Sequence, residues 1–397
     1  MSARRGSART ALGAVGTAIG ALSLLAGVGV VLGRRVVMPG RKRTMRVIAS
    51  TPDTLTLDAT PETLHDGEYG FWFDSDRGHA LVGRILHHDP LGRTVRREIL
   101  RVSGGDLSTA HEGRWTGHVF ARPEDIDPNA REIHIDSPAG PCPAWLFPST
   151  GGEEETTWAI HVHGIRTTRI TALRSVPAAR KLGYTSLVPS FRGDGEAPPT
   201  SNGASALGEA EWEDVDAAIS FAVAHGARSI VLFGWSLGGG IALQLTERSR
   251  HRDVIAALVL IAPATDWRQV IRAGARRAHL PSVVGALGTF ALSTRPLSTL
   301  VGLPRPIDFD ALDWTREPRL TVPSLLIHSD GDREVPASLS RAFVSVNDER
   351  SELALLPPAA HAWEYNVAPD AFEWIVTHWL GRHSQVPGSE HVMNQDG

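Results

Sequence analysis

The chain has 397 residues, of which 42% are hydrophobic, and this apolar content is sufficient for one large domain and a smaller one. Its formal net charge is -4 with both signs mixed along the sequence, so no broadly basic surface forms and nucleic acid is not predicted as a partner. The single cysteine, Cys142, excludes an internal disulfide and any cysteine-based zinc site.

The first predicted element is a helix that crosses a membrane. Thr10 to Gly33 contains no charged residue and would extend about 36 Å as a helix, against a hydrocarbon core of ~30 Å. A cleaved signal peptide, the alternative, would need a shorter apolar region. More basic residues follow the run than precede it, which favours a cytoplasmic catalytic body over an extracytoplasmic one. We therefore predict a single-pass membrane anchor over residues 1–44, in which Gly29 and Gly33 have a spacing that permits close helix contact.

Short alternating apolar runs follow from Met45 to about Asn129, broken by Gly, Pro and Asp. They predict a small β-rich module over residues 45–130, with strands at 54–57, 70–73, 80–86 and 96–102. No cluster in this module has the spacing of a metal or nucleotide site. Its aromatic residues Trp72, Phe73 and Trp115 are predicted to be core residues.

Beyond Arg131 strands alternate with helices, which predicts an α/β domain over residues 131–382 with a mostly parallel sheet covered on both faces. The predicted strands are 132–135, 142–147, 158–162, 185–189, 229–233, 255–261, 324–328 and 352–356. The predicted helices are 172–182, 209–225, 237–248, 339–346 and 369–380. Residues 263–323 form an insertion, predicted to be a cap above the strand ends where open α/β sheets bind ligands. Residues 383–397 are predicted to be a polar tail.

The segment Gly234-Trp235-Ser236-Leu237-Gly238 follows an apolar strand and leads into a helical pattern. In a G-x-S-x-G elbow the serine occupies a strained turn between strand and helix, and the glycines let the two backbones approach closely. Backbone N–H groups at the helix N-terminus can then hold an oxyanion. We therefore predict Ser236 as a nucleophile.

A serine nucleophile needs a base to take its proton and a carboxylate to orient that base. The polar turn 328–336 follows a predicted strand and places two carboxylates at the strand end, of which we choose Asp332 as the acid and keep Asp330 as the alternative. The loop after the last predicted strand carries His361, which we choose as the base. The order of serine, acid and histidine along the chain is the one expected for an α/β-hydrolase.

Over roughly Arg131 to Gly381 these segments resemble the α/β-hydrolase superfamily, particularly its peptidase- and esterase-like branch with a tryptophan beside the elbow. In that family the acid stands four residues after the histidine of a His-Gly-x-x-Asp-x-x-Val-Pro turn. Asp332 has that offset from His328, although Ser329 replaces the usual glycine.

The resemblance also identifies residues 160–165 as the loop whose backbone supplies one oxyanion donor. By position the donors would be the N–H groups of Ile165 and Leu237. The arginine of the Phe191-Arg192-Gly193-Asp194-Gly195 loop is usually structural in this family, so it receives no catalytic role. His161 and His163 would lie on one face of a strand, but no third ligand has a suitable spacing, and we predict no metal and no cofactor.

The sequence thus predicts a membrane-anchored serine hydrolase that cleaves a carboxylic ester or thioester through an acyl-enzyme on Ser236. The expected partner is a small-molecule acyl ester, thioester or peptide. A serine peptidase or amidase, an acyltransferase, and a non-catalytic membrane-tethered scaffold remain as alternatives.

Overall fold

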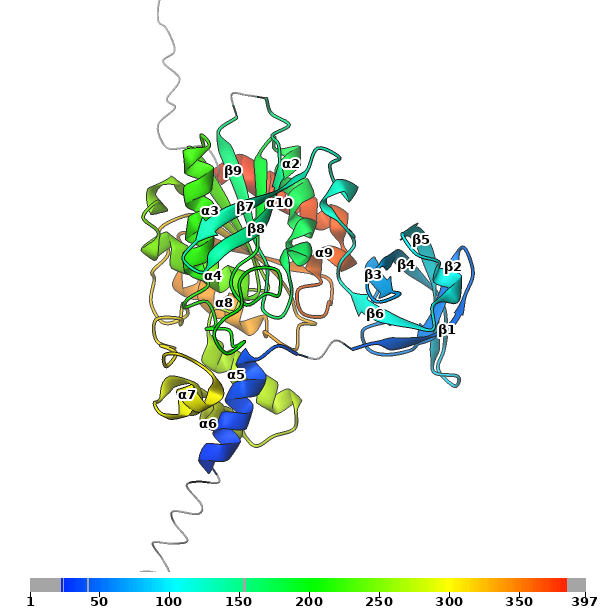
Figure 1. Ribbon diagram of the computed structural model, residues 1–397, viewed down its shortest axis with the longest axis horizontal. Helices are drawn as coiled ribbons and strands as arrows, with labels where there is room; N and C mark the ends of the chain where they lie inside the picture. Colours follow the sequence, from blue (N-terminus) through cyan, green and yellow to red (C-terminus); the bar gives the residue numbers. More distant parts are fainter. Residues whose placement is uncertain (1–22, 24, 41–42, 153–154, 384–397) are drawn as a thin grey trace, which may run out of the picture.

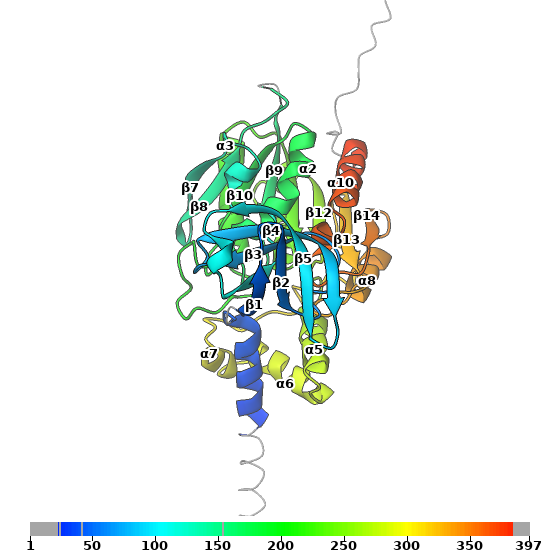
Figure 2. The same ribbon diagram turned by 90° about the vertical axis from the view of Figure 1, so that its right-hand side faces the viewer.

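Two sheets organise the molecule (Figure 1). The computed structural model describes residues 23, 25–40, 43–152 and 155–383. Six strands near the N-terminus close into a barrel, and eight later strands form an open sheet with helices on both faces. Three short helices and a helix at residues 25–37 lie together below this open sheet in the views of Figures 1 and 2.

The barrel forms where the sequence predicts a β-rich module. Its strands follow the order β1-β2-β5-β4-β3-β6. They are β1 (Met45–Ser50), β2 (Thr54–Asp58), β3 (Tyr69–Phe73), β4 (Gly78–Asp89), β5 (Thr94–Ser103) and β6 (Glu112–Thr116). Alternate side chains such as Leu57, Phe71 and Phe73 point inward and form a core of their own. Trp72 lies between two of these inward positions and is only half-buried, and Trp115 is half-buried as well. Of the three aromatic residues predicted to be core residues, only Phe73 is fully buried.

The open sheet has the strand order β14-β13-β12-β11-β9-β10-β8-β7. Its strands are β7 (Arg131–Ser137), β8 (Gly140–Phe147), β9 (Thr157–Val162), β10 (Thr185–Pro189), β11 (Ser229–Trp235), β12 (Ile255–Ile261), β13 (Ser324–Ser329) and β14 (Ser351–Leu356). The strands from β9 to β14 pair in parallel, whereas β8 runs antiparallel to both of its neighbours. All residues of β11 are buried, as expected for a strand covered on both faces.

Helices cover the two faces of the sheet through two separate apolar clusters. The helices of one face are α3 (Trp212–Ala224), α4 (Leu237–Arg248) and α8 (Ser338–Val346). Those of the other face are α2 (Val176–Lys181), which continues the 3₁₀ segment η3 (Arg169–Ser175), and α10 (Pro369–His383). Three further 3₁₀ turns are η1 (Leu107–Thr109), η2 (Pro123–Asp125) and η4 (Arg252–Val254), and the short α9 (Glu364–Val367) precedes α10.

The stretch predicted as a cap lies between β12 and β13. It contains α5 (Trp267–Arg277), α6 (Ser282–Ser293) and α7 (Leu297–Val301). The side chain of Asp266 accepts hydrogen bonds from the first backbone N–H groups of α5, which fixes where that helix begins. None of these three helices was among the predicted ones, since the insertion was predicted without internal elements.

The prediction of a transmembrane helix and of a single-pass membrane localisation is wrong. In the part of the chain that the structure describes, no helix has the length and apolar character needed to cross a bilayer. The predicted span Thr10–Gly33 lies largely outside the described residues, as does the predicted tail beyond His383. The favoured orientation of the catalytic body relied on that span and is withdrawn with it.

The part of the apolar run that the structure describes packs against α6 and α7. A Cβ added to Gly29 would lie 2.7 Å from the backbone oxygen of Leu287 in α6, and one added to Gly33 would lie 2.9 Å from a methyl group of Val301 in α7. Val37, on the same face, is buried in the main core. The small-xxx-small spacing therefore serves a contact within the chain, because glycine lets the two helices approach closely.

Candidate active site

Ser236 lies in a strained turn between β11 and α4. Its backbone has φ 55° and ψ -112°, a conformation that non-glycine residues rarely adopt. The N–H of Ser236 donates to the carbonyl of Ile261 at 2.9 Å, and its own carbonyl accepts from Gly239 at 3.0 Å and Ala264 at 3.2 Å. These bonds to the neighbouring strand and the following helix hold the turn in place.

The glycines of the elbow are required by close backbone contacts. A Cβ on Gly234 would lie 2.6 Å from the carbonyl oxygen of Gly238, and a Cβ on Gly238 would collide with the carbonyl oxygen of Val162 on β9. The sequence folds into this elbow because no side chain intervenes where strand and helix meet.

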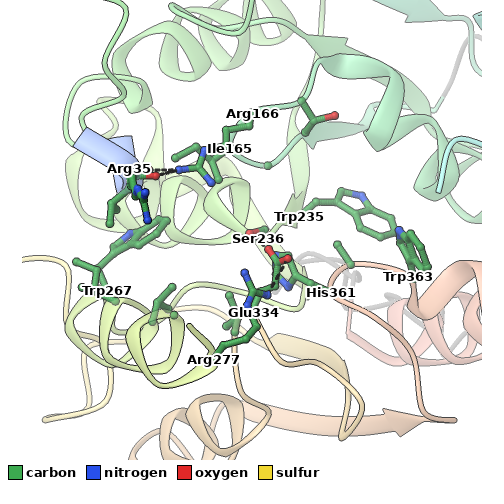
Figure 3. A pocket seen from close by; sticks show the side chains of 18 of the residues that line it. Arg35, Ile165, Arg166, Trp235, Ser236, Trp267, Arg277, Glu334, His361 and Trp363 are labelled. Carbon is green, nitrogen blue, oxygen red and sulfur yellow. Dashed lines mark hydrogen bonds and ion pairs between the residues drawn. The ribbon is translucent and has the colours of Figure 1, made fainter. Parts of the chain in front are cut away.

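Three predicted residues from three strand ends form a continuous chain of hydrogen bonds. Nε2 of His361 is 2.8 Å from Oγ of Ser236, and Nδ1 of His361 is 2.6 Å from Oδ2 of Asp332. Since Asp332 Oδ2 can only accept, Nδ1 carries the proton and Nε2 is left to accept the serine proton. Figure 3 shows Ser236 and His361 next to each other in the pocket.

The structure separates the two candidate acids. The side chain of Asp332 is fully buried, and its Oδ1 accepts the backbone N–H groups of Glu334 and Val335 at 2.8 and 3.0 Å. The side chain of Asp330 is 62% exposed and pairs with Arg341 at 2.8 Å. Only Asp332 therefore reaches the histidine.

Ser329, at the position where the family usually has glycine, links two loops of the site. Oγ of Ser329 donates to the carbonyl of Pro357 at 2.9 Å and accepts the N–H of Ala359 at 2.7 Å. The hydroxyl thereby joins the loop that carries the acid to the loop that carries His361.

Opposite charges shift the pKa values of the acid and the base. Burial lowers the pKa of His361, but the charge and hydrogen bond of Asp332 outweigh burial and raise that pKa above its ordinary value. Burial raises the pKa of Asp332, but His361 and His328 outweigh it and hold that pKa far below its usual range. Both shifts favour a carboxylate beside an imidazolium, which is the charge state produced when Ser236 loses its proton.

A second buried acid, Glu364, lies close to Asp332. Atoms of His328, Asp332 and Glu364 that could bind a metal lie within 4.8 Å of one another. Nε2 of His328 is 3.2 Å from Asp332 Oδ2 and 3.0 Å from the carbonyl of Val335, while its Nδ1 is 2.7 Å from Oγ of Ser340. Because two acceptors face Nε2, that nitrogen carries a proton and has no lone pair for a metal. Burial raises the pKa of Glu364 to about 7.

The two strand histidines considered as metal ligands are fully buried and hydrogen-bonded. Nδ1 of His161 is 2.8 Å from Oγ of Ser175, and Nε2 of His163 is 3.1 Å from Asp194. Burial lowers the pKa of His161 to about 3, so this ring is neutral. Both side chains serve packing.

The predicted oxyanion donors belong to segments that lie against Ser236. Ile165 lines the pocket, and a Cβ added to the preceding Gly164 would lie 3.2 Å from the Cβ of Ser236. Leu237 is the first residue of α4, where backbone N–H groups have no partner within the helix. The positive end of the α4 dipole also points toward the serine.

Arg174, which no motif in the sequence indicated, is a buried residue that holds the loop of His361. Its guanidinium donates to the carbonyl of Ala362, the residue after His361, at 2.6 Å and to Oδ1 of Asn366 at 2.5 Å. It also lies 4.2 Å from the ring of Trp235, the residue before Ser236. Burial lowers the pKa of Arg174 to about 10. An arginine on the buried face of a predicted helix was the one available signal.

Ser236 opens into a pocket of about 600 Å³ that four parts of the chain enclose (Figure 3). The α/β domain supplies Ile165 and Trp235, and the cap supplies Trp267 and Ile271. The helix 25–37 supplies its lining through Leu32, Arg35 and Val36. The end of β6 and the two residues that follow it supply residues 115–118.

The barrel is fixed beside the loop of His361. Nδ2 of Asn366 donates to the carbonyls of Glu68 and Gly117 at 2.6 and 3.0 Å, and the ring of Trp363 packs 4.8 Å from that of Tyr69. The contribution of the barrel and of helix 25–37 to the pocket was not predictable, because no motif in either segment carries chemistry.

The fold and this site define a hydrolase of the α/β class. The chain belongs to the alpha/beta hydrolase family, whose sequence model matches residues 159–373. A second model, described as a domain of unknown function (DUF8805), matches residues 46–116, where the barrel lies. No curated protein matches the chain.

Several solved structures are similar to this one. The esterase Pf2001 of Pyrococcus furiosus shares 17% sequence identity with a TM-score of 0.52, covering 66% of this chain and 96% of its own, which shows a common fold. Est1E of Butyrivibrio proteoclasticus, solved with ferulic acid, shares 16% identity with a TM-score of 0.47 over 63% of this chain and 98% of its own. A thermophilic esterase of Thermogutta terrifontis shares 19% identity with a TM-score of 0.43 over 64% of this chain and 100% of its own.

Proposed function

We propose that the protein hydrolyses a carboxylic ester or thioester through an acyl-enzyme on Ser236. The observation that carries this proposal is the chain of hydrogen bonds from Ser236 through His361 to Asp332, with donor–acceptor distances of 2.8 and 2.6 Å. A scaffold without catalytic function would not need this geometry, and neither would it need a strained serine at the mouth of a pocket.

The proposed reaction has two halves. In the first, Nε2 of His361 accepts the proton of Ser236 Oγ as that oxygen attacks the carbonyl carbon, and the N–H groups of Ile165 and Leu237 stabilise the oxyanion. The tetrahedral intermediate collapses, the bond to the alcohol or thiol breaks, and His361 returns the proton to that leaving group. In the second, His361 takes a proton from water, the resulting hydroxide attacks the acyl carbon, and Ser236 regains its proton as the acid is released.

Asp332 acts on the base and does not itself take up the proton. Its carboxylate keeps the proton of His361 on Nδ1 and stabilises the imidazolium that forms in each half of the reaction. The opposite pKa shifts of the two residues are the electrostatic support for this role.

An ester or thioester is favoured over an amide by the likeness to the Pyrococcus furiosus esterase. A peptidase or amidase and an acyltransferase use the same three residues. They differ in the bond that is cleaved and in the molecule that accepts the acyl group. Product analysis with added alcohol or amine acceptors separates acyl transfer from hydrolysis.

The proposal is tested with Ser236→Ala and His361→Ala. Each variant is expected to lose labelling by a fluorophosphonate probe and to lose at least about 10⁴-fold in hydrolysis of short acyl esters, since removal of one member disables the unit. A panel of acyl esters, thioesters and peptide amides on the wild-type chain identifies the bond that is cleaved. Undiminished turnover in either variant would reject the assignment.

A further inference from the structure

One wall of the pocket is formed by a helix that precedes both the barrel and the α/β domain. Leu32 and Val36 of helix 25–37 line the pocket together with Ile271 of α5 and Gly285 of α6. Apart from Arg35, the helix residues that line the pocket are aliphatic. The region matched by the family model begins at residue 159, so this wall lies outside the matched region.

Hydrogen bonds hold this helix firmly at its C-terminal end. Arg166, the residue after the predicted oxyanion donor Ile165, donates through Nη2 to the carbonyl of Val36 at 2.8 Å and also to that of Arg35. Its Nε donates to the carbonyl of Met38 at 3.1 Å. These carbonyls belong to the last turn, which has no partners within the helix. The oxyanion loop and the pocket wall are therefore joined directly.

Close packing fixes the helix along the rest of its length. Leu32 approaches α6 so closely that a Cβ added to Gly288 would lie 3.3 Å from the Cβ of Leu32. Gly29 and Gly33 pack on α6 and α7 as described above. A wall held in this way presents a fixed surface to a ligand, which is what selection by size requires.

The pocket extends from Ser236 in two directions. In Figure 3, Arg35 and Trp267 lie on one side of Ser236, and Trp363 lies on the other. An ester likewise has two groups, one on each side of its carbonyl carbon. The side between helix 25–37 and α5 offers the aliphatic side chains of Leu32, Val36 and Ile271, beside Arg35 and Trp267. Burying each methylene on aliphatic surface improves binding about fourfold.

We propose that helix 25–37 forms the binding wall for an aliphatic chain of the substrate, and that the side chain at position 32 sets the length of chain accepted. The inference rests on the proposed ester hydrolysis and adds a substrate class to it: esters with an extended aliphatic acyl group. Residues before the hydrolase domain thus determine specificity.

The test compares Leu32→Trp with Val31→Trp on the full-length chain. Val31 is the neighbouring residue, but it is 56% exposed and does not line the pocket. In Leu32→Trp, the ratio of kcat/KM for p-nitrophenyl decanoate to that for p-nitrophenyl acetate is expected to fall at least tenfold. In Val31→Trp it should stay within twofold of wild type. An unchanged ratio in Leu32→Trp, or an equal fall in both variants, overturns the proposal.

A binding measurement separates this inference from the proposed function. In a Ser236→Ala background, calorimetry of decanoate binding should give a dissociation constant at least tenfold higher with Leu32→Trp than with Val31→Trp. If the wild-type chain hydrolyses neither ester, ester hydrolysis fails as the function and the decanoate dissociation constants alone decide the inference. If Leu32→Trp does not fold, Leu32→Ala replaces it, with an expected gain in preference for dodecanoate over decanoate; no gain overturns the proposal.

Discussion

The two sides of the pocket are built by different means. The proposed catalytic side consists of Ser236, Asp332 and His361, which three neighbouring strand ends place within hydrogen-bond distance. Another wall consists of Leu32, Arg35 and Val36, on a helix that reaches the site from the N-terminal part of the chain. We propose that the chemistry depends on directional bonds and the selectivity on the shape of an apolar surface, so a substitution can change one without the other.

The largest effect is expected when Asp332, the proposed acid, is replaced. Asp332→Asn removes the charge that orients His361 and is expected to lower kcat about 10⁴-fold. The matched control is Asp330→Asn, two residues away, whose exposed side chain pairs only with Arg341 and should leave kcat within about twofold. Steady-state kinetics on an ester that the wild type hydrolyses measures both. Inactivity confined to the control would show that the acid is misassigned.

Removing Arg166 tests the connection between the two sides. Arg166→Met loses three hydrogen bonds, to the carbonyls of Arg35, Val36 and Met38 at the end of helix 25–37, and should weaken the local docking of that helix by about 1–2 kcal/mol. Hydrogen exchange of the amides in residues 25–37 is expected to accelerate roughly five- to thirtyfold. Arg316→Met, which removes ion pairs to Asp310 and Asp313, is the control and should leave this exchange unchanged. Equal protection in both variants would mean that Arg166 does not hold the wall.

The smallest expected effect is on the pH dependence of the catalytic side. Only neutral His361 can accept the serine proton, so kcat/KM should rise with pH through the pKa of this residue. Because Asp332 raises that pKa, the midpoint should lie above the ordinary histidine value of about 6.5. The residual activity of Asp332→Asn should show a lower midpoint, because the charge that raises the pKa of His361 is gone. A wild-type midpoint below 6 would contradict the favourable pairing of Asp332 with His361.

Local pattern was enough to predict most of the sheet. Apolar runs such as 229–233 and 255–261 are long, uninterrupted and bounded by turn residues, so their strands were recognisable without a structure. In the candidate site, Ser236 and His361 were recognisable because each follows such a strand. Arg174 was not, since its use depends on carbonyls of a loop almost two hundred residues away.

The apolar run at the N-terminus shows the opposite case. Its composition is that of a bilayer helix, and composition alone does not distinguish burial in lipid from burial in protein. Over the described residues, the contacts of Gly29 and Gly33 with α6 and α7 show that this run is buried in protein. A helix expected to hold the protein in a membrane instead lines its pocket.

By itself, the sequence determined the α/β class, the order of the strands and covering helices of the large sheet, and the elbow at Ser236, because these follow from hydrophobic period and from glycines that only one kind of turn requires. Tertiary structure decided which of two aspartates reaches the histidine and which segments enclose the serine. Those outcomes depend on contacts between residues far apart in the chain, and no local pattern encodes such distances.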